Sequence, residues 1–413
     1  MTKGKTKILV LGGGYAGVMA ALRLAGKTRR LQTEITLVNG LNHFVERLRL
    51  HETVVGKQTR QPAMTEMLRG TAVKFVQGWA TAIAPEARTV TISTEAGTQT
   101  LPYDYLVYAL GSRIEQQRVP GVEEHAYLLD AFGERSASAL QTRLATLRPA
   151  DSVLVAGGGA TGIEAACEIK AKHPQTAVKL LSSGDVGGFK GVTIQTHMLD
   201  ALAEQGIELL ENSPVASVSE TGVALPDGRF LDAQVTVWCG GFQVPDLAKV
   251  AGLPVNRQNQ LLVDPFLRST ACDTIYAVGD AASPVEDPGT PVRMSLLVAL
   301  ITGALAADNI TAVLKQKQQK PLSFATYGQA IALGPEDAVG FNTFPADRPV
   351  GPIFRRKTAV KLRNFFVWML FAFLRIERRL PGFFFWVGQG RYARQQRKIK
   401  RLETAVSPLE SGD

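Results

Sequence analysis

The stretch GGGYAG at residues 12–17 decides the fold of this chain of 413 residues. It follows the apolar run ILVL at residues 8–11 and precedes a helix-like stretch at residues 18–25. This order predicts a dinucleotide-binding turn, in which the first glycine permits the tight turn, the second admits a pyrophosphate to the backbone, and the third allows close helix packing. A second strand at residues 34–38 ends at Asn39, where such folds place a group on the adenosine ribose.

The same arrangement occurs a second time at GGGATG, residues 157–162. It follows SVLVA at residues 152–156 and precedes the apolar run AVKLL at residues 177–181. A single match of this kind is weak, because a glycine-rich turn can simply be a turn. Two matches in strand–helix–strand context predict two dinucleotide-binding domains.

Three further segments indicate which dinucleotide the first of the two turns binds. TIYAVGDAA at residues 274–282 predicts a buried strand that stops at a glycine and presents Asp280, either to a ribityl hydroxyl or as a helix N-cap. YLVYALGS at residues 105–112 and VPG at residues 119–121 accompany it. With the two turns, these segments resemble the two-dinucleotide-binding-domain flavoproteins, the FAD/NAD(P)-dependent pyridine nucleotide oxidoreductases.

The resemblance implies an α/β fold with two Rossmann-like domains. A discontinuous FAD-binding domain is expected at residues 1–113 and 242–325, an inserted NAD(P)H-binding domain at 114–241, and a basic, aromatic C-terminal region at 326–413. The residues expected to bind FAD and the nicotinamide cofactor are Gly12, Gly14, Tyr15, Ala16, Gly17, Asn39, Arg47, Ala80, Ala109, Gly111, Gly157, Gly159, Gly162, Gly279, Asp280 and Leu297.

Two residues are expected to take part in the chemistry. The resemblance implies that Glu164 lies near the nicotinamide and the flavin, where burial beside an aromatic stack would raise its pKa and suit it to handle a proton or to position the nicotinamide. The alternative is an ordinary first-turn acid that interacts with the helix dipole. Arg293 precedes a helix expected to begin near Ser295, and both its charge and the helix N-terminus would stabilise negative charge on the flavin.

Within the family, VTVWCGG at residues 235–241 and DPFLR at 264–268 are similar to type II NADH dehydrogenases and apoptosis-inducing-factor-like reductases. That similarity implies hydride transfer from NADH to FAD and then electron transfer to a quinone. Residues 294–300 lack the glutamine of the quinone-contact motif of type II NADH dehydrogenases, so the acceptor stays open. Ser182 and Ser183 stand where an acid would select NADH, so NADPH stays open beside the favoured NADH.

The cysteines and histidines narrow the chemistry. Cys167, Cys239 and Cys272 are far apart with no Cys-x-x-Cys, which excludes the dithiol branch of the family and predicts buried, unreactive thiols. The five histidines show no zinc-site spacing, so no metal is expected. His51 lies in a segment, residues 44–51, that the resemblance places near the isoalloxazine ring, although a structural role is the alternative.

The C-terminal region carries the basic charge of the chain. Residues 353–403 contain fourteen Lys or Arg against two Glu, or +12, so the rest of this +9 chain carries −3. The apolar run at residues 365–374 is too short to span a bilayer, which takes about 20 residues. The aromatic residues interleaved with this charge are Phe354, Phe365, Phe366, Trp368, Phe371, Phe373, Phe383, Phe384, Phe385 and Trp386.

Three interpretations of this region compete. Aromatic anchors flanked by cations are typical of a membrane-surface segment. A dimerisation or docking element is the second interpretation, and a nucleic-acid patch is disfavoured because the phenylalanines suit lipid or packing better. Because basic residues 1–7 lead directly into a required strand, no signal peptide is expected, and the enzyme is predicted on the cytoplasmic face of the cell membrane. The alternatives are a soluble reductase of a small iron–sulfur protein and a redox-sensing flavoprotein that binds nucleic acid or protein.

Overall fold

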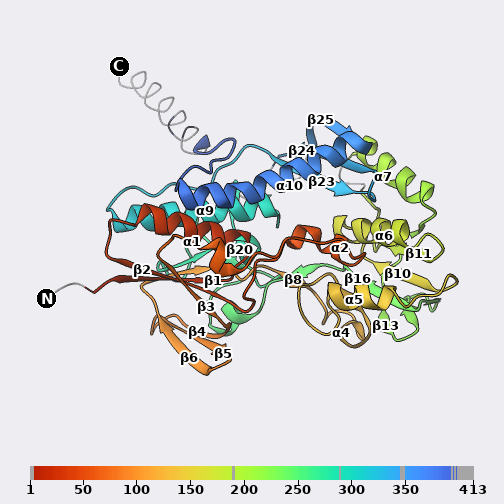
Figure 1. The fold of residues 1–413 in the computed structure, drawn as a ribbon, viewed down its shortest axis with the longest axis horizontal. Coiled ribbons are helices and arrows are strands. Elements are labelled where there is room, and N and C mark those ends of the chain that lie inside the picture. The colour runs from red at the N-terminus through yellow and green to blue at the C-terminus, as the bar shows by residue number, and fades with distance from the viewer. Residues whose placement is uncertain are drawn as a thin grey trace, which may run out of the picture.

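The computed structural model describes residues 4–187, 191–287, 290–344 and 349–391, together with residues 394 and 397. Two five-stranded parallel sheets form two α/β units that lie side by side (Figure 1). The first sheet has the order β19-β7-β1-β2-β3, with bounds Ile275–Ala277, Tyr105–Tyr108, Thr6–Leu11, Thr33–Asn39 and Val73–Gln77. The second has the order β12-β11-β10-β16-β9, with bounds Glu208–Leu210, Ala177–Leu181, Ser152–Ala156, Val235–Trp238 and Tyr127–Leu128.

The chain leaves the first sheet after β7, builds the second sheet and then returns. β19 pairs in parallel with β7, with Tyr276 opposite Val107. The two crossings between the units pair with each other as the short antiparallel strands β8 (Arg113–Ile114) and β17 (Phe242–Gln243). The predicted α/β class with two parallel dinucleotide-type sheets is confirmed.

Smaller sheets accompany the two main ones, and most of them are antiparallel. Three have three strands each: β4 (Trp79–Ala84), β5 (Thr89–Thr94) and β6 (Gly97–Pro102); β13 (Ser217–Ser219), β14 (Gly222–Ala224) and β15 (Phe230–Asp232); β23 (Tyr327–Ala332), β24 (Ala338–Thr343) and β25 (Pro349–Arg355). The short pairs are β18 (Leu261–Leu262), which is parallel to β20 (Ala282–Ser283), and β21 (Val285–Asp287) with β22 (Thr290–Pro291), which is antiparallel.

Helices cover both main sheets. They are α1 (Tyr15–Lys27), α2 (Leu50–Thr53), α3 (Met64–Met67), α4 (Val122–His125), α5 (Ala137–Leu144), α6 (Ala160–Lys172), α7 (Val192–Glu204), α8 (Leu247–Val250), α9 (Leu296–Leu314) and α10 (Arg356–Arg379), with short 3-10 turns η1 (Arg47–Arg49) and η3 (Gly279–Ala281). α9 is the one helix in the described ranges that is long and apolar enough to cross a membrane, but 72% of its apolar window is buried. It packs against α1 in the core of the first unit.

Helix α10 runs across the top of the molecule from α1 and α9 toward the second unit (Figure 1). Its buried positions include Arg363, Val367, Phe371, Leu374 and Glu377, three or four residues apart, which is the spacing of one helix face. The apolar run predicted at residues 365–374 is therefore the middle of a helix of 24 residues. One face of this helix belongs to the core, and the other is exposed.

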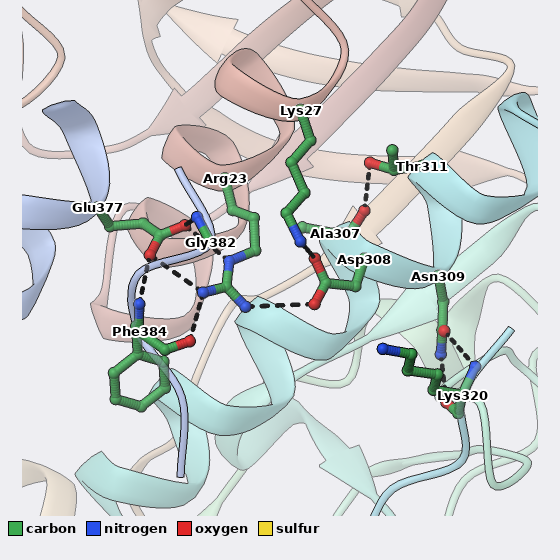
Figure 2. Close-up of polar contacts among 10 residues, drawn as sticks. All are labelled: Arg23, Lys27, Ala307, Asp308, Asn309, Thr311, Lys320, Glu377, Gly382 and Phe384. Atoms are coloured by element: carbon green, nitrogen blue, oxygen red, sulfur yellow. Dashed lines mark hydrogen bonds and ion pairs between the residues drawn. The ribbon is translucent and has the colours of Figure 1, made fainter. Parts of the chain in front are cut away.

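A buried ion pair fixes the end of α10 to α1 (Figure 2). Arg23 donates through Nε and Nη2 to the two carboxylate oxygens of Glu377, at 2.7 and 3.0 Å. The N–H groups of Gly382 and Phe384 donate to the same carboxylate, at 2.5 and 2.9 Å. Asp308 of α9 joins the network through ion pairs to Arg23 and Lys27. Residues that follow α10 are thereby held against the first unit.

The structure adds detail on the C-terminal aromatic residues, on one arginine and on one cysteine. Phe371, Phe384 and Trp386 are buried because α10 and the following segment cover the first unit, so these three aromatics are not available as membrane-surface anchors. Arg363, counted among the surface charges, is also buried. Of the three cysteines predicted to be buried, Cys272 is half-buried.

Candidate active site between the two units and the C-terminal helix

The two glycine-rich turns have the same geometry, position by position. Gly12 and Gly157 have φ of +104° and +134°, and a Cβ on either would lie 2.2 Å or 2.7 Å from the carbonyl oxygen of a residue that follows the neighbouring strand, Ala109 or Cys239. A Cβ on Gly17 or Gly162 would lie 1.9 or 1.8 Å from the carbonyl oxygen of the first glycine of its own turn. Side chains are therefore excluded at these four positions by backbone alone.

The middle of each turn is open. A Cβ on Gly14 or Gly159 would have no atom within 4 Å. These glycines are also the N-caps of α1 and α6, and neither helix has a side-chain cap. Uncapped first-turn N–H groups beneath an open backbone form a cradle for phosphate, and its positive dipole end favours the charge. Both turns fit the pyrophosphate of a dinucleotide.

Two other segments that were predicted to bind FAD lie close to the first turn or to each other. Gly279 approaches Ala16, with the position of a Gly279 Cβ only 3.0 Å from the Ala16 methyl group. Ser112, after Gly111, donates to Asp280 at 2.7 Å. Asp280 lies inside η3, whose N-cap is Val278, so the alternative of a helix N-cap is wrong. Burial raises the pKa of Asp280, partly offset by the Ser112 hydrogen bond.

The other predicted cofactor residues come from several different elements. Asn39 accepts the Gly13 N–H at 2.8 Å, so its amide supports the turn itself. Tyr15 packs edge-on against Phe44, with ring centroids 4.9 Å apart. The remaining positions are Arg47 in η1, paired with Asp130 at 3.5 Å; Ala80 in β4, opposite Ile92; Ala109, whose N–H donates to Leu11; and Leu297 in the first turn of α9.

Glu164 occupies a junction of three regions of the chain. It lies on α6 of the second unit and is buried, and its Oε1 accepts the Ala332 N–H of β23 at 3.0 Å. His51 of α2 approaches from the first unit, with Nδ1 3.6 Å from Glu164 Oε2. Arg363 of α10 approaches from the C-terminal region, with Nη2 3.9 Å from Oε1. The carboxylate thus has one hydrogen bond and two charged or polar neighbours beyond hydrogen-bond range.

The surroundings of Glu164 set its protonation. Burial raises the pKa of Glu164 to about 7, against the opposing effects of the Arg363 charge and the Ala332 N–H. Burial and the Arg363 charge lower the pKa of His51 to about 3. Near neutral pH, Glu164 exchanges between its acid and its carboxylate, whereas His51 stays neutral. The expected rise of the Glu164 pKa comes from burial among polar groups of α2, β23 and α10.

Arg293 lies just before α9, whose first residue is Leu296 and whose N-cap is Ser295, with Oγ accepting the Val298 N–H at 3.3 Å. Arg293 Nη1 donates to Gln329 Oε1 of β23 at 2.7 Å. Ala332, which holds Glu164, belongs to the same strand. β23 therefore contacts both residues predicted to be catalytic.

Sequence reasoning missed Arg363 and Glu52 as members of this junction. Arg363 donates to Glu52 Oε1 at 3.2 Å and contacts His51 Nε2 at 2.9 Å. These partners lie 311 and 312 residues away from Arg363 along the chain. The available signal was the single arginine on the apolar face of α10, because a charge on such a face needs a buried partner.

The fold and these sites define a flavoprotein with two dinucleotide-binding domains. The chain matches the Pyridine nucleotide-disulphide oxidoreductase family over residues 6–303 and belongs to it. It is an FAD-dependent NAD(P)H oxidoreductase, as the resemblance implied. Within the described residues, no group of three or more His, Cys, Asp or Glu is placed to hold a metal ion.

The chain is also similar to several individual proteins. An NADH dehydrogenase-like protein of Mycobacterium tuberculosis is 29% identical over 360 residues, covering 81% of this chain and 87% of its own. A type II NADH:quinone oxidoreductase of Staphylococcus aureus is 25% identical over 370 residues, covering 82% and 90%. The structure of the sulfide:quinone oxidoreductase of Aquifex aeolicus aligns with a TM-score of 0.77, 21% identity and coverage of 92% and 93%, and shares the fold.

Proposed function

We propose that this enzyme is an NADH:quinone-type oxidoreductase that works on the cytoplasmic surface of a membrane. The observation that carries the proposal is Glu164, a buried carboxylate whose pKa is raised to about 7 where the two dinucleotide-binding units and α10 meet. Reduction of a quinone consumes protons as well as electrons. A group that is half-protonated near neutral pH suits that need.

Each of the two phosphate cradles is assigned to one cofactor. Gly12 to Gly17 and Asp280 would hold FAD, and Gly157 to Gly162 would hold the nicotinamide dinucleotide. Bound FAD supplies the redox chemistry, because it accepts hydride from the nicotinamide and passes electrons on to the acceptor. The chain holds the two cradles in one structure, and Glu164 lies on α6, the helix that begins at the second cradle.

Carboxylates around the second turn support NADH over NADPH. Glu211 accepts the Val186 N–H at 2.6 Å, and Asp185 accepts from the Asn212 amide at 3.2 Å. Both carboxylates lie in or against the loop that follows β11, where the adenosine ribose binds in this fold. Negative charge there favours a free ribose hydroxyl over a 2′-phosphate.

The dithiol chemistry of sulfide:quinone enzymes is not supported. Cys167 and Cys239 are both buried, and burial raises the pKa of each thiol to about 12. Such thiols are protonated at neutral pH and poor nucleophiles. The electron donor is therefore the reduced nicotinamide.

The exposed face of α10 and the segment after it support membrane association. Phe365 and Trp368 are each 53% exposed, and Phe385 is 70% exposed. Lys361, Arg375 and Arg379 are exposed on the same helix. Exposed aromatics beside cations suit an anionic lipid surface, at about 1 kcal/mol for each cation near the headgroups. An apolar acceptor dissolved in that membrane would then lie near the enzyme.

Anaerobic stopped-flow mixing of the FAD-loaded protein with NADH or NADPH, and then with a short-chain quinone, tests the proposal. We expect fast bleaching by NADH and fast recovery of the flavin colour by quinone. Bleaching without recovery would remove quinone and favour a protein acceptor such as a small iron–sulfur protein. Very slow bleaching would favour a redox sensor.

Flotation with liposomes tests the location. The full chain should float with vesicles that contain anionic lipid, and Phe365→Ser with Trp368→Ser should reduce the floated fraction. Phe230→Ser is the matched control, because Phe230 is 47% exposed on β15, in a different region of the chain. Failure of the full chain to float would contradict the membrane proposal, and equal flotation of all three proteins would show that Phe365 and Trp368 do not mediate binding. Neither outcome bears on the redox reaction.

A further inference from the structure

We propose that His51, held in one tautomer by Arg363, is a positioning residue that controls how tightly Glu164 holds its proton. The inference rests on the proposed role of Glu164 in proton handling. It concerns residues from three regions of the chain: α2, α6 and α10.

The hydrogen bond between Arg363 and His51 decides the tautomer. Arg363 Nη2 lies 2.9 Å from His51 Nε2. A guanidinium has donors and no acceptor, so Nε2 must accept, and the ring proton of neutral His51 must be on Nδ1. Nδ1 is the atom that faces Glu164 Oε2, at 3.6 Å. The positive end of an N–H dipole is thus aimed at the carboxylate.

The other charged groups around Glu164 have partners of their own. Glu52, on α2, pairs with Arg49 at 2.6 Å and with Arg363 at 3.2 Å. Glu168, one turn along α6, pairs with Lys57 at 2.8 Å. Arg363 is shared among Glu52, His51 and Glu164, and stays 3.9 Å from the last.

These partners leave His51 as the polar side chain nearest to Glu164 Oε2 among the contacts described. Burial keeps His51 neutral, so it orients a dipole and does not carry the proton itself. Its Nδ1–H stabilises the carboxylate form of Glu164 and opposes the effect of burial. Loss of this dipole should make Glu164 hold its proton more tightly. A purely structural histidine would pack equally well with either ring nitrogen protonated.

The first test is the ring tautomer. Protein labelled with 15N in its five histidine rings gives few enough signals for long-range 1H–15N spectra, and a His51→Asn variant assigns the one that disappears. We expect His51 to be neutral with the proton on Nδ1 from about pH 6 to 8. A proton on Nε2, or a charged ring at about pH 6, would overturn the proposal.

The second test is the pH dependence of quinone reduction. His51→Phe removes the dipole, whereas His51→Asn keeps an amide N–H near the position of Nδ1. We expect His51→Phe to raise the apparent pKa of kcat by about half a unit, less than the loss of a hydrogen bond to a charge because Nδ1 lies 3.6 Å from Oε2, and His51→Asn to restore the wild-type profile. His173→Asn, at the far end of α6, is the matched control and should change nothing.

The outcomes separate this inference from the proposed function. If Glu164→Gln had no effect on quinone reduction, the proposed role of Glu164 in proton transfer would be wrong. The 15N spectrum would still report the tautomer of His51 independently of that result. A correct tautomer with an unshifted profile in His51→Phe would show that His51 is structural. A profile raised equally in both His51 variants would show that packing, and not the N–H dipole, is responsible.

Discussion

Helices α1 and α6 each follow a glycine-rich turn of the same geometry, yet the charged side chains that they bury differ in how many hydrogen bonds surround them. Arg23 of α1, 1% exposed, faces a Glu377 carboxylate that accepts four hydrogen bonds (Figure 2). Glu164 of α6 accepts one hydrogen bond from Ala332, while His51 and Arg363 stop at 3.6 and 3.9 Å. A fully bonded buried charge fixes two elements together, whereas a partly bonded carboxylate is free to change its protonation.

The largest expected effect is on protein stability, when the fully hydrogen-bonded carboxylate of Glu377 is removed. Glu377→Ala should lower the free energy of unfolding by about 3–5 kcal/mol, because it removes the acceptor of two Arg23 donors and two backbone N–H groups and leaves the buried guanidinium to the longer pair with Asp308 at 3.3 Å. Urea unfolding of the flavin-loaded protein measures it. Glu34→Ala breaks the exposed pair with Lys74 and should cost less than about 1 kcal/mol. Similar losses in the two variants would show that burial does not distinguish these pairs.

Removal of the partly hydrogen-bonded carboxylate, Glu164, should change the rate of one half-reaction. Glu164→Gln should slow reoxidation of the flavin by quinone about 100-fold, since the amide has no proton to give. Bleaching by NADH should stay within about twofold of wild type, because hydride transfer needs no general acid. Stopped-flow traces of the two half-reactions measure both. Equal slowing of both steps would mean that Glu164 positions the nicotinamide instead.

The pH dependence of stability gives an effect of intermediate size. Between its ordinary value of 4.5 and about 7, folded Glu164 binds a proton that the unfolded chain does not, so its contribution falls as pH rises. Between about 3 and 6.5, unfolded His51 binds a proton that the folded ring does not, so its contribution rises with pH. The two slopes, each about 1.4 kcal/mol per pH unit, oppose each other where the ranges overlap.

Single variants should expose each slope. Stability of Glu164→Gln should rise with pH between about 5 and 6.5, and stability of His51→Phe should fall over the same range. Urea unfolding at several pH values, compared with wild type, gives the difference. Two variants with slopes of the same sign would contradict the assignment of these protonation states.

The smallest expected effect concerns Gly159, the open glycine of the second glycine-rich turn. A Gly159→Ala change should weaken NADH binding about tenfold, or about 1.4 kcal/mol, because the methyl group enters the phosphate cradle. Unfolding of the apoprotein should change by about 1 kcal/mol or less, since no atom lies within 4 Å. Gly162→Ala, with a Cβ 1.8 Å from the Gly157 oxygen, should destabilise the protein strongly. Fluorescence titration with NADH and urea unfolding separate the two.

Much of the two α/β units was predictable because their signals are local. The strand–turn–helix order at Gly12 and again at Gly157 placed both turns and both sheets correctly. The prediction for α10 was incomplete, because composition reports aromatic and basic content without saying which face is covered. Phe371 and Trp368 lie three residues apart in sequence, but one is 2% exposed and the other 53%.

The sequence by itself determined the family, the two cradles and the candidacy of Glu164, since glycine positions and strand-turn-helix order depend on neighbours in the chain. The tertiary structure alone decided that Arg363 and His51 reach Glu164, and that Glu377 clamps α10 to Arg23. These pairings join segments hundreds of residues apart. Burial supplies the physical reason for their importance, because a charge removed from water takes its state from whichever partners the fold brings within a few ångströms.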